Sequence, residues 1–302
     1  MNPIGTLTRR NLQLFLRDRM TVFFSFLSTI ILVMLYFLFI GKIYTTQMDD
    51  SAMGGIAMPL AEGAKSFIVY LQMMAGVLAL NSMSLATGAF STIAKDFETR
   101  RVDSLMLTPV KPYQMILAYY ATGLIASFII NTFTWIASFL IIGFATGYWL
   151  NAGSVLLVLA VLLVASLISC SIMLLITSLV KSSSAIGVIN GIAGTFFGFL
   201  CGIYMPYSNL GDTTKAVGSF LPFTHLTIWL KRVMLGDAFT QLHIPDAFRE
   251  ILYRDFFSAD GVGLAGMDVP LGAMVVLSGA LGLMCLVASY LLLHRRIKGQ
   301  KG

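Results

Sequence analysis

Charged residues are scarce in this sequence. Of its 302 residues, 20 are Lys or Arg and 14 are Asp or Glu, together 11%, whereas soluble domains carry about 25%. So few charges do not cover a water-facing surface, which excludes an ordinary soluble enzyme, a disordered chain and a disulfide-stapled secreted module. Because 57% of the residues are apolar and the mean hydropathy is +0.85, the composition indicates an integral membrane protein.

Cysteine is also rare, and it shows no metal-binding pattern. Cys170, Cys201 and Cys285 all lie in apolar segments without CxxC spacing, so we expect neither a disulfide framework nor a metal site. The formal net charge is +6, but the basic residues form short clusters beside long uncharged runs. That pattern is typical of membrane topology rather than of nucleic-acid binding.

Ionisable residues are absent from the long apolar runs. Intramembrane catalysis needs a nucleophile with a base, or paired carboxylates, inside the bilayer, and ion-coupled transport usually needs buried ionisable groups. His225, His243 and His294 lie in loops or at the edge of an apolar run. The phosphate-binding motif G-x-x-x-x-G-K-[ST] is missing as well. We therefore expect no catalytic residue and no ATP hydrolysis in this chain.

The apolar runs predict an all-α polytopic membrane protein with six transmembrane helices. A helix needs about 20 apolar residues to cross the hydrocarbon core. The run 112–180 is too long for one crossing and divides at turn-forming residues near 143–153. The six predicted spans are 21–40, 67–93, 114–142, 154–179, 185–205 and 270–293.

The distribution of basic residues predicts the orientation of these spans. With six crossings, 13 Lys and Arg residues fall on the side of the two termini and 7 on the other side. By the positive-inside rule, both termini are expected in the cytoplasm.

The segment 5–19 has the pattern of an amphipathic helix. We expect its apolar residues to face lipid and its basic residues to meet anionic headgroups; a simple topology anchor is the alternative. The apolar residues are Leu7, Leu12, Phe15 and Leu16, and the basic ones are Arg9, Arg10, Arg17 and Arg19.

Small and polar residues form stripes within three predicted spans. Glycines in the fifth span recur at helical spacing, which lets two helices approach closely, either within one subunit or between two. The polar stripes in the second and third spans indicate interhelical hydrogen bonds or, alternatively, substrate contacts. The stripes are Gly187, Gly191, Gly194, Gly198 and Gly202; Asn81, Ser84 and Gly88; and Ser127, Asn131, Thr134 and Ser138.

Two connecting segments carry further patterns. Charged and apolar residues alternate over 95–109, which predicts a short amphipathic helix; there Val102, Leu105 and Met106 would offer an apolar knob to a soluble partner. Residues 217–230 are apolar but too short to cross, so 206–268 is expected to hold re-entrant or interfacial helices. Residues 237–268 would then form a small extracellular cap.

Over nearly its whole length the chain resembles the permease subunit of ABC-2-type exporters. The segment 98–110 is similar to the family's charged stretch that ends in [ST]-P-[VL], and 221–226 is similar to its N-P-[LF]-[TS]-[YH]-[LA] motif. Two further features are the basic lead-in before the first span and the segment 205–210 after the fifth. The order of these motifs along the six spans supports the resemblance. Arg100 and Arg101 replace a glycine and a small residue, and Leu221 replaces the motif's asparagine.

The resemblance implies one transmembrane domain over 1–302 and specific partners. Residues 1–19 would be the elbow helix, 20–205 spans one to five, 206–268 the extracellular re-entrant part, and 269–302 the sixth span and tail. A coupling helix at 97–108 would contact a separate P-loop ATP-binding cassette subunit, which holds ATP and Mg. The residues assigned to that contact are Glu98, Arg100, Arg101, Val102, Leu105, Met106 and Pro109; the re-entrant motif has Pro222, Phe223 and His225.

The resemblance also implies a function in a bacterial plasma membrane. A second permease chain, identical or different, would complete a path lined by spans two and five. The expected cargo is hydrophobic or amphipathic, such as a drug, a peptide antibiotic or a lipid. The alternatives are a polysaccharide or teichoic-acid exporter and a non-transporting scaffold or immunity protein that binds a ligand through 237–268.

Overall fold

The computed structural model describes most of the chain. The described residues are 3–20, 22, 23, 27, 30, 31, 34, 38, 41–51, 60–180, 182–200, 211–253, 257, 262–264 and 267–299. Most of the first predicted span, 21–40, lies outside this set, as do Cys201, Gly202, the motif at 205–210 and part of the predicted cap.

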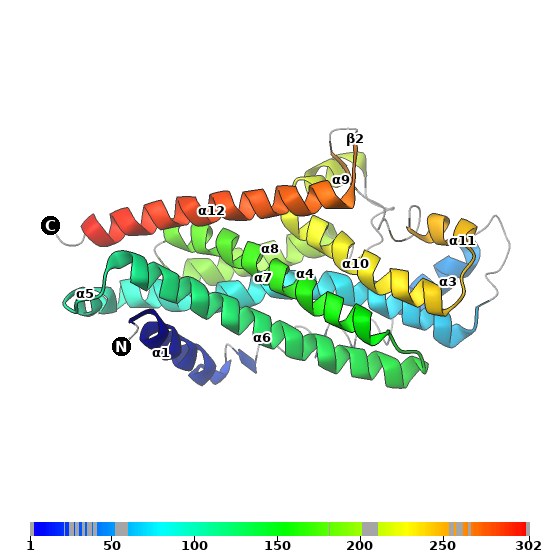
Figure 1. Cartoon of the computed structure of the whole chain (residues 1–302), viewed down its shortest axis with the longest axis horizontal. Coiled ribbons are helices and arrows are strands. Elements are labelled where there is room, and N and C mark those ends of the chain that lie inside the picture. The colour runs from blue at the N-terminus through cyan, green and yellow to red at the C-terminus, as the bar shows by residue number, and fades with distance from the viewer. Residues whose placement is uncertain are drawn as a thin grey trace.

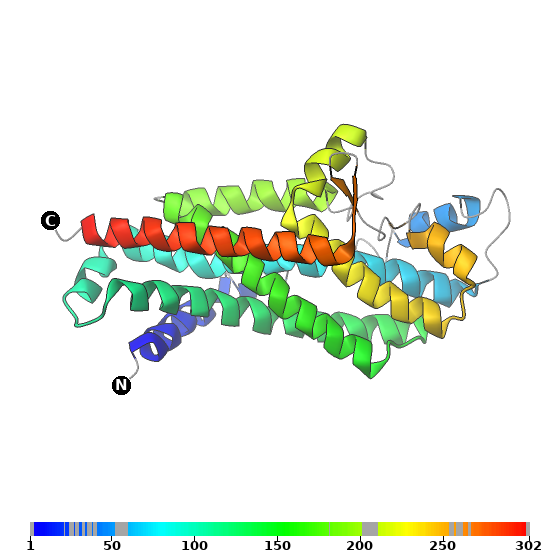
Figure 2. The ribbon, with the colours of Figure 1, turned by 45° about the horizontal axis from the view of Figure 1, so that its top comes forward.

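Long helices run roughly along one axis of an elongated bundle (Figures 1 and 2). The N- and C-terminal ends lie at the same end as α5, called the α5 end below, and α3 and α11 lie at the opposite end. The helices are α1 (Pro3–Arg17), α3 (Gly41–Ser51), α4 (Glu62–Glu98), α5 (Arg101–Met106), α6 (Pro112–Thr146), α7 (Ala152–Leu179), α8 (Ser183–Leu200), α9 (Asp212–Ser219), α10 (Pro222–Gln241), α11 (Asp246–Ile251) and α12 (Leu271–Gly299).

Five of the described helices are long and apolar enough to cross a membrane: α4, α6, α7, α8 and α12. They coincide with the second to sixth predicted spans, although α4 and α6 extend several residues beyond both predicted ends. At 1.5 Å per residue, the 37 residues of α4 reach about 55 Å, well beyond the roughly 30 Å hydrocarbon core. This helix therefore continues outside the bilayer.

Helix α4 is the centre of the bundle, in contact with α6, α7, α8 and α10. In its most apolar stretch 89% of the residues are buried, against 17% in α8 and in α12. Neighbouring helices bond to some of its polar groups: the Asn131 side-chain amide donates to Leu78 O at 3.1 Å and to Ser82 Oγ at 2.7 Å. The polar stripe of the third predicted span thus makes interhelical hydrogen bonds, one of the two expected roles.

Helix α1 packs on the bundle instead of lying free in the membrane surface. Leu7 and Phe15 are buried, and Phe15 belongs to a small apolar cluster with Leu85 and Ala89 of α4 and residues of α6. The expectation that Leu7 and Phe15 face lipid was therefore wrong, because the small side chains of α4 and α6 leave a groove that accepts them. Leu16, which is 53% exposed, keeps its outward position.

The segment between α8 and α12 folds back on the bundle. Helices α9 and α10 form an angled pair, and Pro222 begins α10 at a position where a helix has no need of the missing N–H. A short antiparallel hairpin of β1 (Val262–Leu264) and β2 (Met267–Val269) leads into α12. This hairpin, absent from the all-α expectation, is a small exception in a helical fold.

Candidate functional site at the end of α4

The chain reverses sharply between α4 and α5. Thr99 closes α4, its Oγ1 donating to Lys95 O at 2.7 Å, and Arg100 adopts a left-handed conformation with φ 54°. Helix α5 then begins at Arg101. The single coupling helix expected over 97–108 is therefore a shorter helix at 101–106, and Glu98 is the last residue of α4.

The reversal at Arg100 changes which side chains of this segment are accessible. Val102 is fully buried in the main apolar core, with Leu105 half-buried against it, whereas Leu107 is 90% exposed. Val102 thus fixes α5 to the bundle, and the prediction that it belongs to an exposed apolar knob was wrong. Arg100, Arg101 and Pro109 are exposed; the Met106 side chain lies outside the described residues.

The last four residues of α4 (Lys95, Asp96, Phe97 and Glu98), called the terminal turn below, each contact a different part of the bundle. The Lys95 ammonium lies 3.4 Å from the Asp18 carboxylate, just after α1. This pair is largely exposed, so its contribution to stability is small. Asp96 and Phe97 are buried, whereas Glu98 is exposed.

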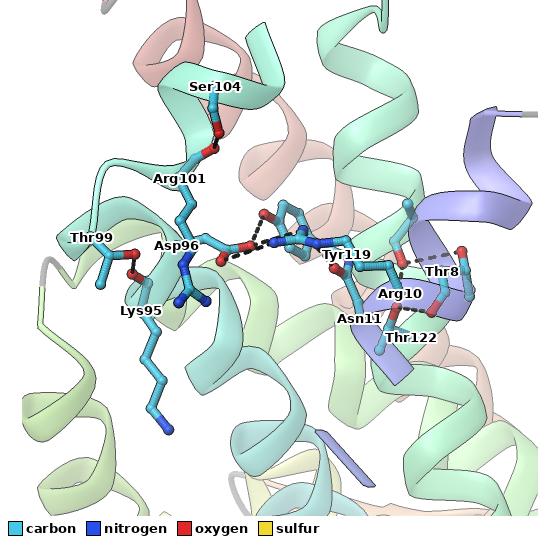
Figure 3. A network of polar contacts seen from close by, with 11 residues as sticks. Thr8, Arg10, Asn11, Lys95, Asp96, Thr99, Arg101, Ser104, Tyr119 and Thr122 are labelled. Carbon is cyan, nitrogen blue, oxygen red and sulfur yellow. Dashed lines mark hydrogen bonds and ion pairs between the residues drawn. The ribbon is translucent and has the colours of Figure 1, made fainter. Parts of the chain in front are cut away.

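Asp96 is the buried member of the terminal turn, with a side chain 1% exposed. The Arg10 guanidinium of α1 donates to its two carboxylate oxygens at 3.4 and 3.5 Å, and the Tyr119 hydroxyl of α6 donates to it at 2.8 Å (Figure 3). A buried carboxylate requires such partners. Asp96 therefore holds α1, α4 and α6 together.

Phe97 and Glu98 connect the terminal turn to the other side of the bundle. The Arg296 guanidinium of α12 lies 4.2 Å from the centre of the Phe97 ring and donates to Val180 O after α7 at 3.4 Å. The Glu98 carboxylate accepts hydrogen bonds from the Ser183 backbone N–H at 2.8 Å and from its hydroxyl at 2.9 Å. Glu98 thereby caps the N-terminus of α8, where backbone N–H groups have no partner within the helix.

These contacts make the terminal turn a mechanical junction. Only two residues, Thr99 and Arg100, separate α5 from this turn, which contacts α1, α6, α8 and α12. Composition alone gave no sign of this junction. The partners Tyr119, Ser183 and Arg296 were missed because they come from distant parts of the sequence, and Asp96 was read only as one charge of an amphipathic segment.

The other predicted site residues lie in two further places. On α4, Asn81 is buried and Ser84 accepts a hydrogen bond from the Asn190 amide of α8 at 3.1 Å. Among the residues that the structure describes, no atom lies within 4 Å of a Cβ added at Gly187, Gly191 or Gly194. Gly198 is buried.

The residues of the predicted re-entrant motif lie at the start of α10, where they contact α8, α9 and α12. The Phe223 ring packs against Phe197 of α8, with centroids 5.1 Å apart. His225 Nε2 lies 2.8 Å from Ser219 O of α9, and Nδ1 lies 2.9 Å from Ser278 Oγ of α12. Because a carbonyl only accepts, Nε2 carries the proton. Pro222, Phe223 and His225 therefore fix the angled α9–α10 pair.

No group of three or more His, Cys, Asp or Glu side chains is placed to hold a metal ion within the described part of the chain. Comparison with curated proteins gives no match. The family described as ABC-2 family transporter protein matches residues 43–293, which include the terminal turn, α5, the glycine row and the α9–α10 pair. The chain therefore belongs to the ABC-2 transporter family, as a multi-pass membrane permease whose matched domain does not itself contain the ATPase.

Proposed function

We propose that this chain is the permease subunit of an ATP-driven exporter that moves a hydrophobic or amphipathic substrate out of the cell. ABC-2 permeases generally pair with an ATP-binding cassette subunit. The main support for the proposal is the terminal turn. Helix α5 follows this turn, is fixed to the bundle by the buried Val102, and is followed by the exposed Leu107. The α5 end faces the cytoplasm, in agreement with the basic residues gathered there.

The ATP-binding subunit docks on the outer face of the α5 segment. Leu107 presents an almost fully exposed apolar side chain, flanked by Pro109 and by the basic residues Arg100 and Arg101. Closure of the ATP-binding subunits moves α5, and the bonds of the terminal turn carry that movement to α1, α6, α8 and α12. The partner subunit, not this chain, binds ATP and Mg.

A second permease chain completes the transport path against α8. The exposed side of α8 combines the open glycine positions with large apolar side chains, among them Ile192 at 66% and Phe196 at 55% exposure. Between two such faces the path is apolar with few polar groups, since the sequence 185–205 contains no charged residue. This lining favours a hydrophobic or amphipathic cargo.

The docking proposal is tested by adding a charge at Leu107. In Leu107→Asp, we expect the chain to enter the membrane normally but to lose the co-purifying ATP-binding subunit and the stimulation of its ATPase activity. The matched control is Ile43→Asp on α3, an apolar side chain 55% exposed at the opposite end. Wild-type stimulation in Leu107→Asp, or an equal loss in Ile43→Asp, would contradict docking at α5.

A further inference from the structure

A pocket of about 160 Å³ lies beside the terminal turn, between α1, α4 and the start of α5. A liquid water occupies about 30 Å³, so the pocket has room for a group of several heavy atoms. One part of its wall is apolar, formed by Leu14, Phe15 and Gly88, and the other carries charged groups and hydroxyls, including Thr92 and Arg101. This division suits an amphipathic ligand.

The pocket wall carries two acidic and two basic side chains: Asp18, Asp96, Lys95 and Arg101. Its two carboxylates are already paired: Asp96 binds Arg10 and Tyr119, and Asp18 lies 3.4 Å from the Lys95 ammonium. Arg101 is exposed and has no ion-pair partner among the residues that the structure describes. In the view of Figure 3 the Arg101 and Lys95 side chains extend in the same direction. The Arg101 guanidinium is therefore available to an anionic ligand.

We propose that this pocket binds the phosphate-bearing head group of an anionic phospholipid in the cytoplasmic leaflet. The planar guanidinium of Arg101 matches the oxygens of a phosphate group, and the Thr92 hydroxyl lines the same pocket. Leu14 and Phe15 cover the apolar glycerol and upper acyl region. The choice of the cytoplasmic leaflet rests on the orientation given under Proposed function.

The Arg100 side chain provides a matched control, because it is the next residue, equally basic and exposed, but does not line the pocket. Native mass spectrometry of the purified full chain, without the ATP-binding subunit, counts bound phosphatidylglycerol and phosphatidylcholine from mixed micelles. We expect preferential retention of phosphatidylglycerol, a roughly tenfold loss of that affinity in Arg101→Gln, from lost charge-assisted hydrogen bonds, and wild-type retention in Arg100→Gln. Arg101→Lys is expected to restore part of the affinity.

Three outcomes would overturn the proposal. Equal retention of the two lipids would show that the head-group charge is not recognised, and equal loss in Arg100→Gln and Arg101→Gln would show a general surface-charge effect. Displacement of phosphatidylglycerol by excess inorganic phosphate would assign the pocket to soluble phosphate compounds instead. Because the assay contains no ATP-binding subunit, a failure of ATPase docking at α5 leaves its result unchanged.

Discussion

At the scale of single residues, the account depends most on Asp96. Its carboxylate is buried and satisfied by Arg10 from α1 and Tyr119 from α6. Removing one partner from a buried charge costs more than the pair itself contributes, since the remaining group keeps its desolvation penalty. Arg10 is therefore a positioning residue for the elbow helix α1, although its sequence pattern gave it only a role at lipid headgroups.

Replacement of Arg10 tests this role. We expect Arg10→Gln to lower the free energy of unfolding by about 2 kcal/mol, the usual range for a hydrogen bond to a charged group. Thermal unfolding in detergent measures the effect, with Arg9→Gln as the control because Arg9 is exposed on the same helix. Equal melting temperatures for the two variants would contradict a structural role for the Arg10–Asp96 pair.

The exposure of individual residues around α5 was only partly predictable from the sequence. The helical spacing over 98–108 placed Val102 and Leu105 on one apolar face, and both do face apolar surroundings. The sequence did not reveal that this face turns inward. The left-handed residue Arg100 breaks the helical phase between α4 and α5, so Val102 packs into the core and Leu107 points outward.

At the scale of helices, two carboxylates cap the N-termini of neighbouring helices. Glu98 caps α8 at the α5 end, and Asp237 of α10 accepts hydrogen bonds from the Asn151 backbone N–H at 2.7 Å and from its amide at 2.6 Å, at the start of α7. Each cap ties a helix end to an element distant in sequence. Glu98, three residues before α5, is therefore hydrogen-bonded directly to the start of α8, the helix that we propose lines the path.

Loss of the Glu98 cap is expected to separate the movement of α5 from that of α8. Spin labels at Ser104→Cys on α5 and Val188→Cys on α8, with the native cysteines replaced by alanine, report their distance in the intact complex. In Glu98→Ala we expect a broader distance distribution, while Glu250→Ala on α11, also an exposed acid, keeps the wild-type distribution. An unchanged distribution in Glu98→Ala would rule out this link.

Helix positions were predicted well because crossing a bilayer imposes a length and an apolar composition that the sequence shows directly. Which helices contact one another was not predicted, because an apolar residue that faces lipid has the same hydropathy as one that faces protein. Thus α4, the most buried helix, was expected to line the path like α8. Only its polar residues, such as Asn81 and Ser84, indicated contacts with neighbouring helices.

At the scale of the whole molecule, the chain has one buried central helix and two outer helices with little cover. Helices α8 and α12 each have 17% of their most apolar stretch buried, yet their surfaces differ. On α8 three glycines at steps of four and three, Gly187, Gly191 and Gly194, have no described atom within 4 Å of an added Cβ. On α12 two such glycines, Gly272 and Gly279, are seven residues apart among large exposed side chains such as Val276 and Leu283. The closer glycine spacing suits a second helix, so we propose that the second permease chain packs on α8.

A bulky residue in the glycine row is expected to prevent this pairing. In Gly191→Trp the indole fills space that none of the described residues occupies, so we expect the chain to remain folded but to run as a monomer in size-exclusion chromatography with light scattering. Val276→Trp, at a position 70% exposed on α12, is expected to keep the wild-type oligomeric state. Pairing that survives Gly191→Trp would move the interface away from α8.

The central claim is that the exposed segment beside α5 touches an ATP-binding subunit, and crosslinking at Leu107 tests it most directly. Leu107→Cys, in a complex purified from its own membrane and treated with a short thiol-reactive photocrosslinker, is predicted to give an adduct with a P-loop ATPase subunit. Ile43→Cys, at the opposite end, is predicted to give none. An intact complex whose ATPase subunit never crosslinks to Leu107→Cys would contradict the account.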